Sequence, residues 1–410
     1  MEVFSELLVL LVTARLFGEI AERLGHPSSV GEIIAGMALA GIVVLFGGDV
    51  AFLHQLPDSD VLSMVANIGI FALVLFAGIE MEPGEIGKHS KAYIAVAGGG
   101  MVAPLLGGVA LAWWFLPPSE LKQAQVLIAG VALSISAIPE STKILSDLGQ
   151  MHTPAGRTIV GAALFDDVFG LFLLAVVLAM IETGQVPDVS AFALLVGKVF
   201  AFFTITVLLG VHVYPRVSKH LKTMQAAALE FSALAAVAIA YGWLAEVLGM
   251  HWILGAFMAG LYFERSRVGV RAYQEMRLFF SVVTRGFLGP LFFLSIGLRV
   301  SMEAVTEVPL FLVLVIAIAF LGKMVGGGVP ALMTGLSRKE ALAVGVGMNA
   351  RGAVELIVLS IAQHAGLFDP VPGDGPIVRN LYSTLVLMGV ITTVLSPMLL
   401  RRILLRTGRE

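Results

Sequence analysis

Long apolar runs dominate this chain, and short loops carrying charged, glycine or proline residues separate them. A run of about 20 apolar residues can cross a bilayer as an α-helix. The pattern predicts thirteen membrane-spanning helices, at residues 4–24, 29–47, 60–81, 91–116, 123–147, 155–181, 189–213, 225–248, 250–264, 277–298, 308–335, 339–366 and 380–405. The expected fold class is therefore an all-α, multi-pass membrane protein.

The composition supports a protein that spans a lipid bilayer. Apolar residues make up 58% of the 410 positions and charged residues only 13%, against about 25% charged in an average soluble domain. The chain has no cysteine, which excludes disulfides, thiolate metal sites and cysteine nucleophiles. No basic stripe suggests a nucleic-acid partner, and we expect no cofactor. The first segment, residues 1–24, lacks the features of a cleaved signal peptide and is expected to be a retained helix.

Lysine and arginine residues concentrate on one set of alternating helix ends. That set carries 18 of them, the opposite set carries 3, and the other five lie within the predicted spans. Cytoplasmic loops of membrane proteins are enriched in Lys and Arg, so the basic set is expected to face the cytoplasm. In a cell (inner) membrane, this places the N-terminus outside and the C-terminus in the cytoplasm.

Two stretches in the first half of the chain have counterparts in the second half. Glycine triplets open Gly98–Pro104 and Gly326–Pro330, and polar stretches interrupt the predicted spans at Ser134–Thr142 and Gly347–Glu355. Seven helices separate each stretch from its counterpart, so the second copy would have inverted topology. Inverted repeats with a pair of interrupted helices are typical of secondary transporters. Alternatively, glycine triplets simply allow two helices to pack closely.

Asp166 and Asp167 are adjacent carboxylates inside an apolar span. One such residue at the centre of a helix costs roughly 2.5–3.5 kcal/mol on insertion scales, so a pair indicates a functional site for protons or small cations. Consecutive helical positions point about 100° apart, so one acid can meet a fixed cation while the other faces a cavity. Lys323, deep in the second half, is the expected fixed cation. A purely structural salt bridge between Asp166 and Lys323 is the alternative, and the two roles are compatible.

The two predicted breaks offer further oxygen ligands. Unwound backbone carbonyls and half-helix dipoles can coordinate a bare cation, and Ser134, Ser136 and Asn349 add side-chain oxygens there. A serine in a membrane helix otherwise bonds the backbone of the preceding turn.

Three more ionisable residues lie near the breaks: Glu140, Arg351 and Glu355. They are candidates for the ion site. We favour mutual pairing that neutralises the crossed breaks over direct contact with the ion.

Five motifs, taken together and in order, resemble the monovalent cation:proton antiporter superfamily, in particular its second branch. That branch includes NapA-like Na+/H+ exchangers, glutathione-gated K+ efflux systems and plant cation/H+ exchangers. The motifs are Val30–Gly36, Phe71–Glu80, Ala132–Pro139, Phe165–Val168 and Met348–Leu356, and the resemblance runs over nearly the whole chain.

The resemblance implies a thirteen-helix fold of the NhaA type, with inverted repeats and two crossed, discontinuous helices. It implies a panel for dimerisation at residues 1–88 and 225–300, a mobile core at 89–182 and 305–406, and a linker helix at 189–213. By the same resemblance, Asp167 binds the cation or proton, Asp166 pairs with Lys323, and the Asp-Asp pair indicates electrogenic exchange. Glu140 stands where many relatives carry an apolar residue.

The expected function is exchange of a monovalent cation for protons by alternating access, in a homodimer embedded in the bilayer. Na+ is the first expectation, with K+ or Li+ as other substrates, and Lys323 could release a proton as the cation binds. A K+/H+ antiporter or K+ efflux transporter of the same fold is the alternative. The K+ efflux systems carry a cytosolic nucleotide-binding domain after the membrane part, whereas this sequence ends just past its last predicted span. An ion channel and an organic-anion symporter are more distant alternatives. An enzyme is not expected.

Overall fold

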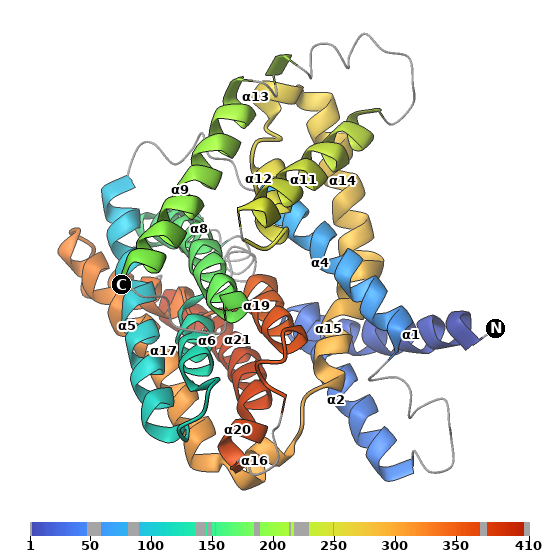
Figure 1. The fold of residues 1–410 in the computed structure, drawn as a ribbon. Coiled ribbons are helices and arrows are strands. Elements are labelled where there is room, and N and C mark those ends of the chain that lie inside the picture. Colours follow the sequence, from blue (N-terminus) through green and yellow to red (C-terminus); the bar gives the residue numbers. More distant parts are fainter. Residues whose placement is uncertain are drawn as a thin grey trace.

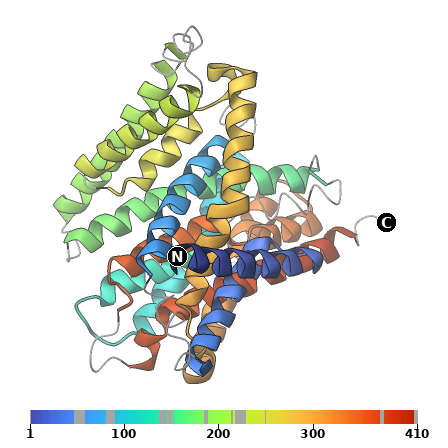
Figure 2. The same cartoon turned by 90° about the vertical axis from the view of Figure 1, so that its right-hand side faces the viewer.

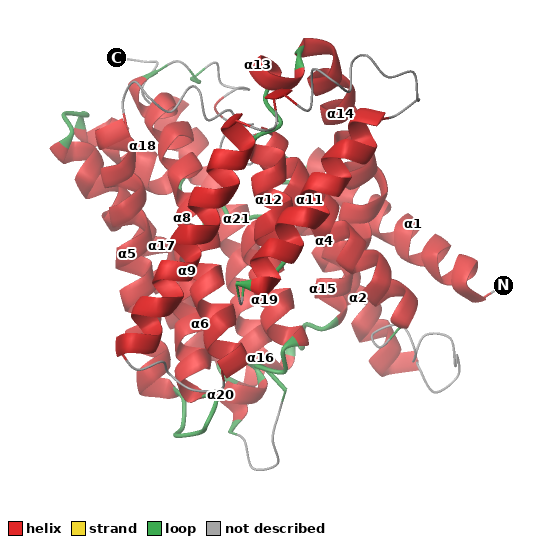
Figure 3. Ribbon diagram, turned by 45° about the horizontal axis from the view of Figure 1, so that its top comes forward, coloured by secondary structure: helices red, strands yellow, loops and turns green. Residues whose placement is uncertain are grey.

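A computed structural model describes residues 2–46, 59–80, 90–136, 145, 150–151, 153–183, 189–212, 215–216, 229–248, 250–369 and 375–405. All regular secondary structure in these residues is helical (Figure 3). Apolar side chains cover much of the outside of the helices, as expected where lipid replaces water. The fold is therefore that of an all-helical membrane protein.

Helices of the first half follow one another with short connections. They are α1 (Glu2–Arg23), α2 (Ser28–Phe46), α4 (Asp60–Glu80), α5 (Ser90–Phe115), α6 (Lys122–Ser134), α8 (Pro154–Thr183) and α9 (Val189–His212).

Helices of the second half are more often interrupted. They are α11 (Leu229–Val247), α12 (Ile253–Leu261), α13 (Arg265–Val268), α14 (Val270–Val283), the π-helical turn η3 (Thr284–Leu288), α15 (Gly289–Leu298), α16 (Glu303–Glu307), α17 (Pro309–Met333), α18 (Arg338–Gly347), α19 (Ala353–His364), α20 (Pro376–Arg379) and α21 (Leu381–Leu405). The span expected at 277–298 thus begins earlier, at residue 270, and contains a π-helical turn.

Six helical stretches in the described residues are long and apolar enough to cross a membrane: Asp60–Glu80, Lys91–Phe115, Leu229–Val247, Val270–Leu298, Pro309–Met333 and Leu381–Leu404. Shorter apolar helices, such as Val354–His364, lie among them. The protein is therefore a multi-pass membrane protein.

The helices form two groups that lie side by side (Figure 1), and Figure 2 looks onto the group that holds the N-terminus. One group contains α5, α6, α8, α17, α18 and α21, and the chain ends beside it. The other contains α1, α2, α4, α11, α12, α14 and α15, and the chain begins there. Helix α19 lies between the groups and contacts α4, α6, α8 and α21.

Glycine allows α5 and α17 to pack backbone against backbone. A Cβ atom at Gly99 would collide with the carbonyl oxygen of Gly326, and a Cβ at Gly326 would collide with the carbonyl oxygen of Gly99. The two glycine triplets therefore face each other, as the packing alternative for them requires. This contact joins the equivalent helices of the two halves directly.

Replacing Gly99 with alanine should destabilise the protein by about 1–3 kcal/mol, the usual cost of inserting a methyl group into a tightly packed contact. Gly98→Ala is the matched control, because a Cβ at Gly98 meets nothing within 4 Å. Thermal unfolding of the purified protein in detergent measures both variants. Equal midpoints for the two variants would contradict the α5–α17 contact.

Candidate functional site

The second predicted break is present in the structure. Helix α18 ends at Gly347, α19 begins at Ala353, and residues 348–352 between them are not helical. The terminal carbonyls of α18 are satisfied by side chains: Ser396 Oγ donates to Val346 O at 2.7 Å, and Asn349 Nδ2 donates to Gly345 O at 2.8 Å. The buried unwound segment is thus stabilised from within the protein, as backbone at membrane depth requires.

The first break begins where α6 ends at Ser134. Ile135, the next residue, has an extended backbone. The hydroxyl of Ser134 donates to Val131 O at 2.8 Å. This is the hydrogen bond to the preceding helical turn that was the alternative to a role as an ion ligand. Residues 137–144, including Glu140, lie outside the described part of the chain.

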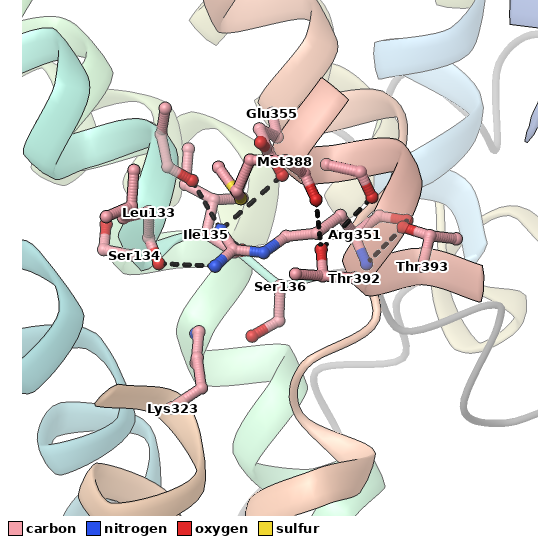
Figure 4. Close-up of polar contacts among 12 residues, drawn as sticks. Leu133, Ser134, Ile135, Ser136, Lys323, Arg351, Glu355, Met388, Thr392 and Thr393 are labelled. Atoms are coloured by element: carbon pink, nitrogen blue, oxygen red, sulfur yellow. Dashed lines mark hydrogen bonds and ion pairs between the residues drawn. The ribbon is translucent and has the colours of Figure 1, made fainter. Parts of the chain in front are cut away.

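Arg351 joins the segment after α18 to the end of α6. Its guanidinium donates to the carbonyl oxygens of Leu133 at 2.7 Å and Ile135 at 2.8 Å, and also to the carbonyl of Ala132 (Figure 4). These are orphan carbonyls at the C-terminal end of α6, where the helix dipole is negative. The sequence suggested that such carbonyls would coordinate a bare cation, but the described carbonyls here bind an arginine instead.

Thr393 of α21 fixes the backbone of Arg351. The Arg351 amide donates to Thr393 Oγ1 at 3.1 Å, and that hydroxyl donates to Arg351 O at 3.0 Å. Sequence reasoning missed both this contact and the one from Ser396. The only signal for them was the polar composition of Thr392, Thr393 and Ser396 inside an otherwise apolar span.

The structure brings Asp166 and Lys323 together at the centre of the core. Lys323 Nζ on α17 lies 2.8 Å from Asp166 Oδ2 on α8, and neither side chain is exposed. The backbone amide of Ser136 donates to the same carboxylate oxygen at 2.8 Å. Asp166 therefore links α8, α17 and the extended segment that follows α6.

Several buried oxygens near the breaks have no hydrogen-bond partner in the described residues: Asp166 Oδ1, Ser136 Oγ, Asn349 Oδ1 and both carboxyl oxygens of Glu355. Buried polar atoms are nearly always satisfied, so oxygens of this kind indicate a place for water or an ion. Asp167 follows Asp166 on α8, and its side chain lies outside the described part of the structure.

The family model described as "Sodium/hydrogen exchanger, transmembrane" matches residues 8–406 of the chain. The sequence is 27% identical over 400 residues to the Na(+)/H(+)-K(+) antiporter GerN of Bacillus cereus, which covers 98% of this chain and 96% of that protein. It is 25% identical over 401 residues to the Na(+)/H(+) antiporter of Enterococcus hirae, with 98% of each covered.

Cation/H(+) antiporter 15 of Arabidopsis thaliana is 30% identical over 405 residues, covering 95% of this chain but 47% of that longer relative. The structure also resembles the sodium proton antiporter MjNhaP1 of Methanocaldococcus jannaschii, with a TM-score of 0.74 over 97% of this chain and 96% of that one. Sequence identity to MjNhaP1 is 16%, so this likeness concerns the fold.

Replacing Lys323 with methionine should destabilise the protein by about 3–5 kcal/mol, because it leaves the Asp166 carboxylate buried without its counter-charge. The double variant Asp166→Asn/Lys323→Met should recover much of that loss. Arg271→Gln serves as a control, since it breaks an exposed pair with Glu275 and should change little. Thermal unfolding in detergent is the measurement. A Lys323→Met midpoint equal to wild type would contradict the role of the pair.

Proposed function

The chain belongs to the sodium/hydrogen exchanger family and is a cation/proton antiporter, and on this premise we propose that it exchanges Na+ for protons at Asp167. The observation that carries the proposal is the buried pair of Asp166 and Lys323. Lys323 and the Ser136 amide already engage Asp166. Consecutive positions of an α-helix are about 100° apart, and we assign the mobile ion to the neighbouring acid, Asp167.

One acidic group can couple two ions by competition. A protonated Asp167 cannot hold Na+, and bound Na+ excludes the proton. If the loaded site opens alternately to the two sides of the membrane, an inward proton gradient drives Na+ out. Asp166 Oδ1, Ser136 Oγ and Asn349 Oδ1 are buried acceptors suited to a dehydrated cation, with Na+ as the transported substrate.

The movement would take place between a core at residues 89–182 and 305–406 and a panel at 1–88 and 225–300, with 189–213 as the linker helix. The glycine contact between α5 and α17 supports the core as one unit. Gly36 against Leu294 and Gly78 against Phe257 make equally close backbone contacts on the panel side. Such packing favours rigid-body movement of each unit.

We extend the proposal to a thirteen-span fold of the NhaA type, with inverted repeats and crossed breaks, the N-terminus outside and the C-terminus in the cytoplasm. The bonds from Arg351 to the end of α6 support a crossing of the two breaks. A homodimer through the panel is supported by an exposed apolar stripe at every fourth position of α1: Phe4, Leu8, Val12, Leu16 and Ile20.

K+ is the second candidate substrate, because the similar GerN protein is named an Na(+)/H(+)-K(+) antiporter. Exchange of two protons for one cation would move one net charge, worth about 2.3 kcal/mol per 100 mV of membrane potential. We propose this electrogenic stoichiometry for the chain.

In proteoliposomes, Asp167→Asn should abolish Na+ flux driven by a pH gradient, and K+ flux as well if K+ is carried. The amide cannot alternate between a carboxylate and a neutral acid, so neither ion can be exchanged. Asp60→Asn, at the exposed start of α4, is a control and should transport like wild type. Transport at the wild-type rate by Asp167→Asn would refute the assignment of the site.

A further inference from the structure

Glu355 is a buried carboxyl group that the exchange reaction described above does not use. It lies in the first turn of α19 and is not exposed. Neither of its carboxyl oxygens makes a hydrogen bond within the described structure. The nearest cation is Arg351, whose Nη1 is 3.6 Å from Glu355 Oε2.

Arg351 offsets the charge of Glu355 without donating a hydrogen bond to it. Its guanidinium directs hydrogen bonds to the carbonyls of Ala132, Leu133 and Ile135 at the end of α6. In Figure 4, Glu355 lies beside the guanidinium while Arg351 reaches across to the end of α6. The salt bridge therefore lacks the direct hydrogen bonds that make a buried ion pair strong.

Two opposing effects act on this carboxyl group. The positive N-terminus of α19 and the charge of Arg351 stabilise the carboxylate. Complete burial without a hydrogen bond stabilises the neutral acid. A buried carboxyl group held between two such opposing effects is a candidate for taking up and releasing a proton.

The described groups around Glu355 donate no hydrogen bond to its carboxyl oxygens. Across from it, α21 contributes Gly389, where a Cβ atom would lie 3.1 Å from Glu355 Oε1. The nearby Thr392 hydroxyl donates to Met388 O at 2.9 Å and is not directed at Glu355.

The charged groups that α17 and α8 bring near Glu355 are Lys323 and Asp166, which neutralise each other. On the described parts of α4 and α6, the ionisable residues Asp60, Glu80 and Lys122 lie at helix ends.

We propose that Glu355 is a second proton-carrying group of the transporter, so that one proton travels on Asp167 and another on Glu355 in each cycle. The proposal rests on the antiport function proposed above and assigns its second proton. It differs from the expectation that Lys323 releases that proton. A neutral Lys323 would leave the Asp166 carboxylate, 2.8 Å away and fully buried, without its counter-charge.

The charges of the core balance under this assignment. With the Asp166 and Lys323 pair neutral, the groups that remain are Asp167, Glu355 and Arg351. When both acids are protonated, the unit carries the single positive charge of Arg351. When Asp167 holds a cation and Glu355 is ionised, the unit is neutral. The unit therefore carries one positive charge inward when it holds the protons and no charge outward when it holds the cation. Each cycle moves one net charge, so exchange is electrogenic.

The test is the number of protons moved per cation, obtained from the reversal potential of Na+ flux in proteoliposomes with defined Na+, pH and voltage gradients. Glu355→Gln should reduce that number from two to one and make exchange insensitive to voltage. Asp60→Asn, at the exposed start of α4, should keep the wild-type ratio. An unchanged ratio in Glu355→Gln, or an equal reduction in Asp60→Asn, would overturn the proposal.

A readout independent of transport separates this proposal from the antiport function. On acidification of the detergent-solubilised protein, infrared difference spectra should show the C=O stretch of a newly protonated buried carboxyl. The band assigned to Glu355 should persist in Asp167→Asn and disappear in Glu355→Gln. If wild-type protein moves no cation, the antiport function fails while this spectral result stands. A spectrum unchanged by Glu355→Gln overturns the proton site.

Discussion

The ion pair between Lys323 and Asp166 is the constraint on which the core of this protein depends. Two charges at membrane depth are tolerated only when they neutralise each other, and here the 2.8 Å contact does so with both side chains fully buried. The Ser136 amide brings the end of the first break to the same carboxylate. This engagement of Asp166 is the observation behind our proposal that the adjacent Asp167 takes the mobile ion.

Arg351 imposes a second constraint, at the helix ends. A helix that ends inside a membrane exposes carbonyl groups that lipid cannot satisfy. Arg351 binds those at the end of α6, while Ser396 and Asn349 bind those at the end of α18. The described carbonyls at the end of α6 are therefore occupied by an arginine.

Much of this arrangement could be predicted from the sequence. Apolar runs gave the all-helical membrane fold, and the paired glycine triplets and polar stretches indicated where helices pack and where one of them breaks, at residues 348–352. Lys323 was identified as the partner of Asp166 because a buried acid requires a nearby cation. The partners of Arg351 could not be predicted, since backbone carbonyls carry no residue signature and the end of α6 depends on local geometry. The π-helical turn at Thr284–Leu288 left no recognisable pattern either.

If a proton and a cation contend for one carboxylate, then adding the cation alone must expel protons from the resting protein. Calorimetric titration of Na+ into the purified transporter, repeated at one pH in buffers that differ in ionisation enthalpy, counts the protons released per ion bound. Release of between one and two protons, lost when Asp167 is replaced by asparagine, is the predicted result. Saturable Na+ binding without any proton release would contradict the account.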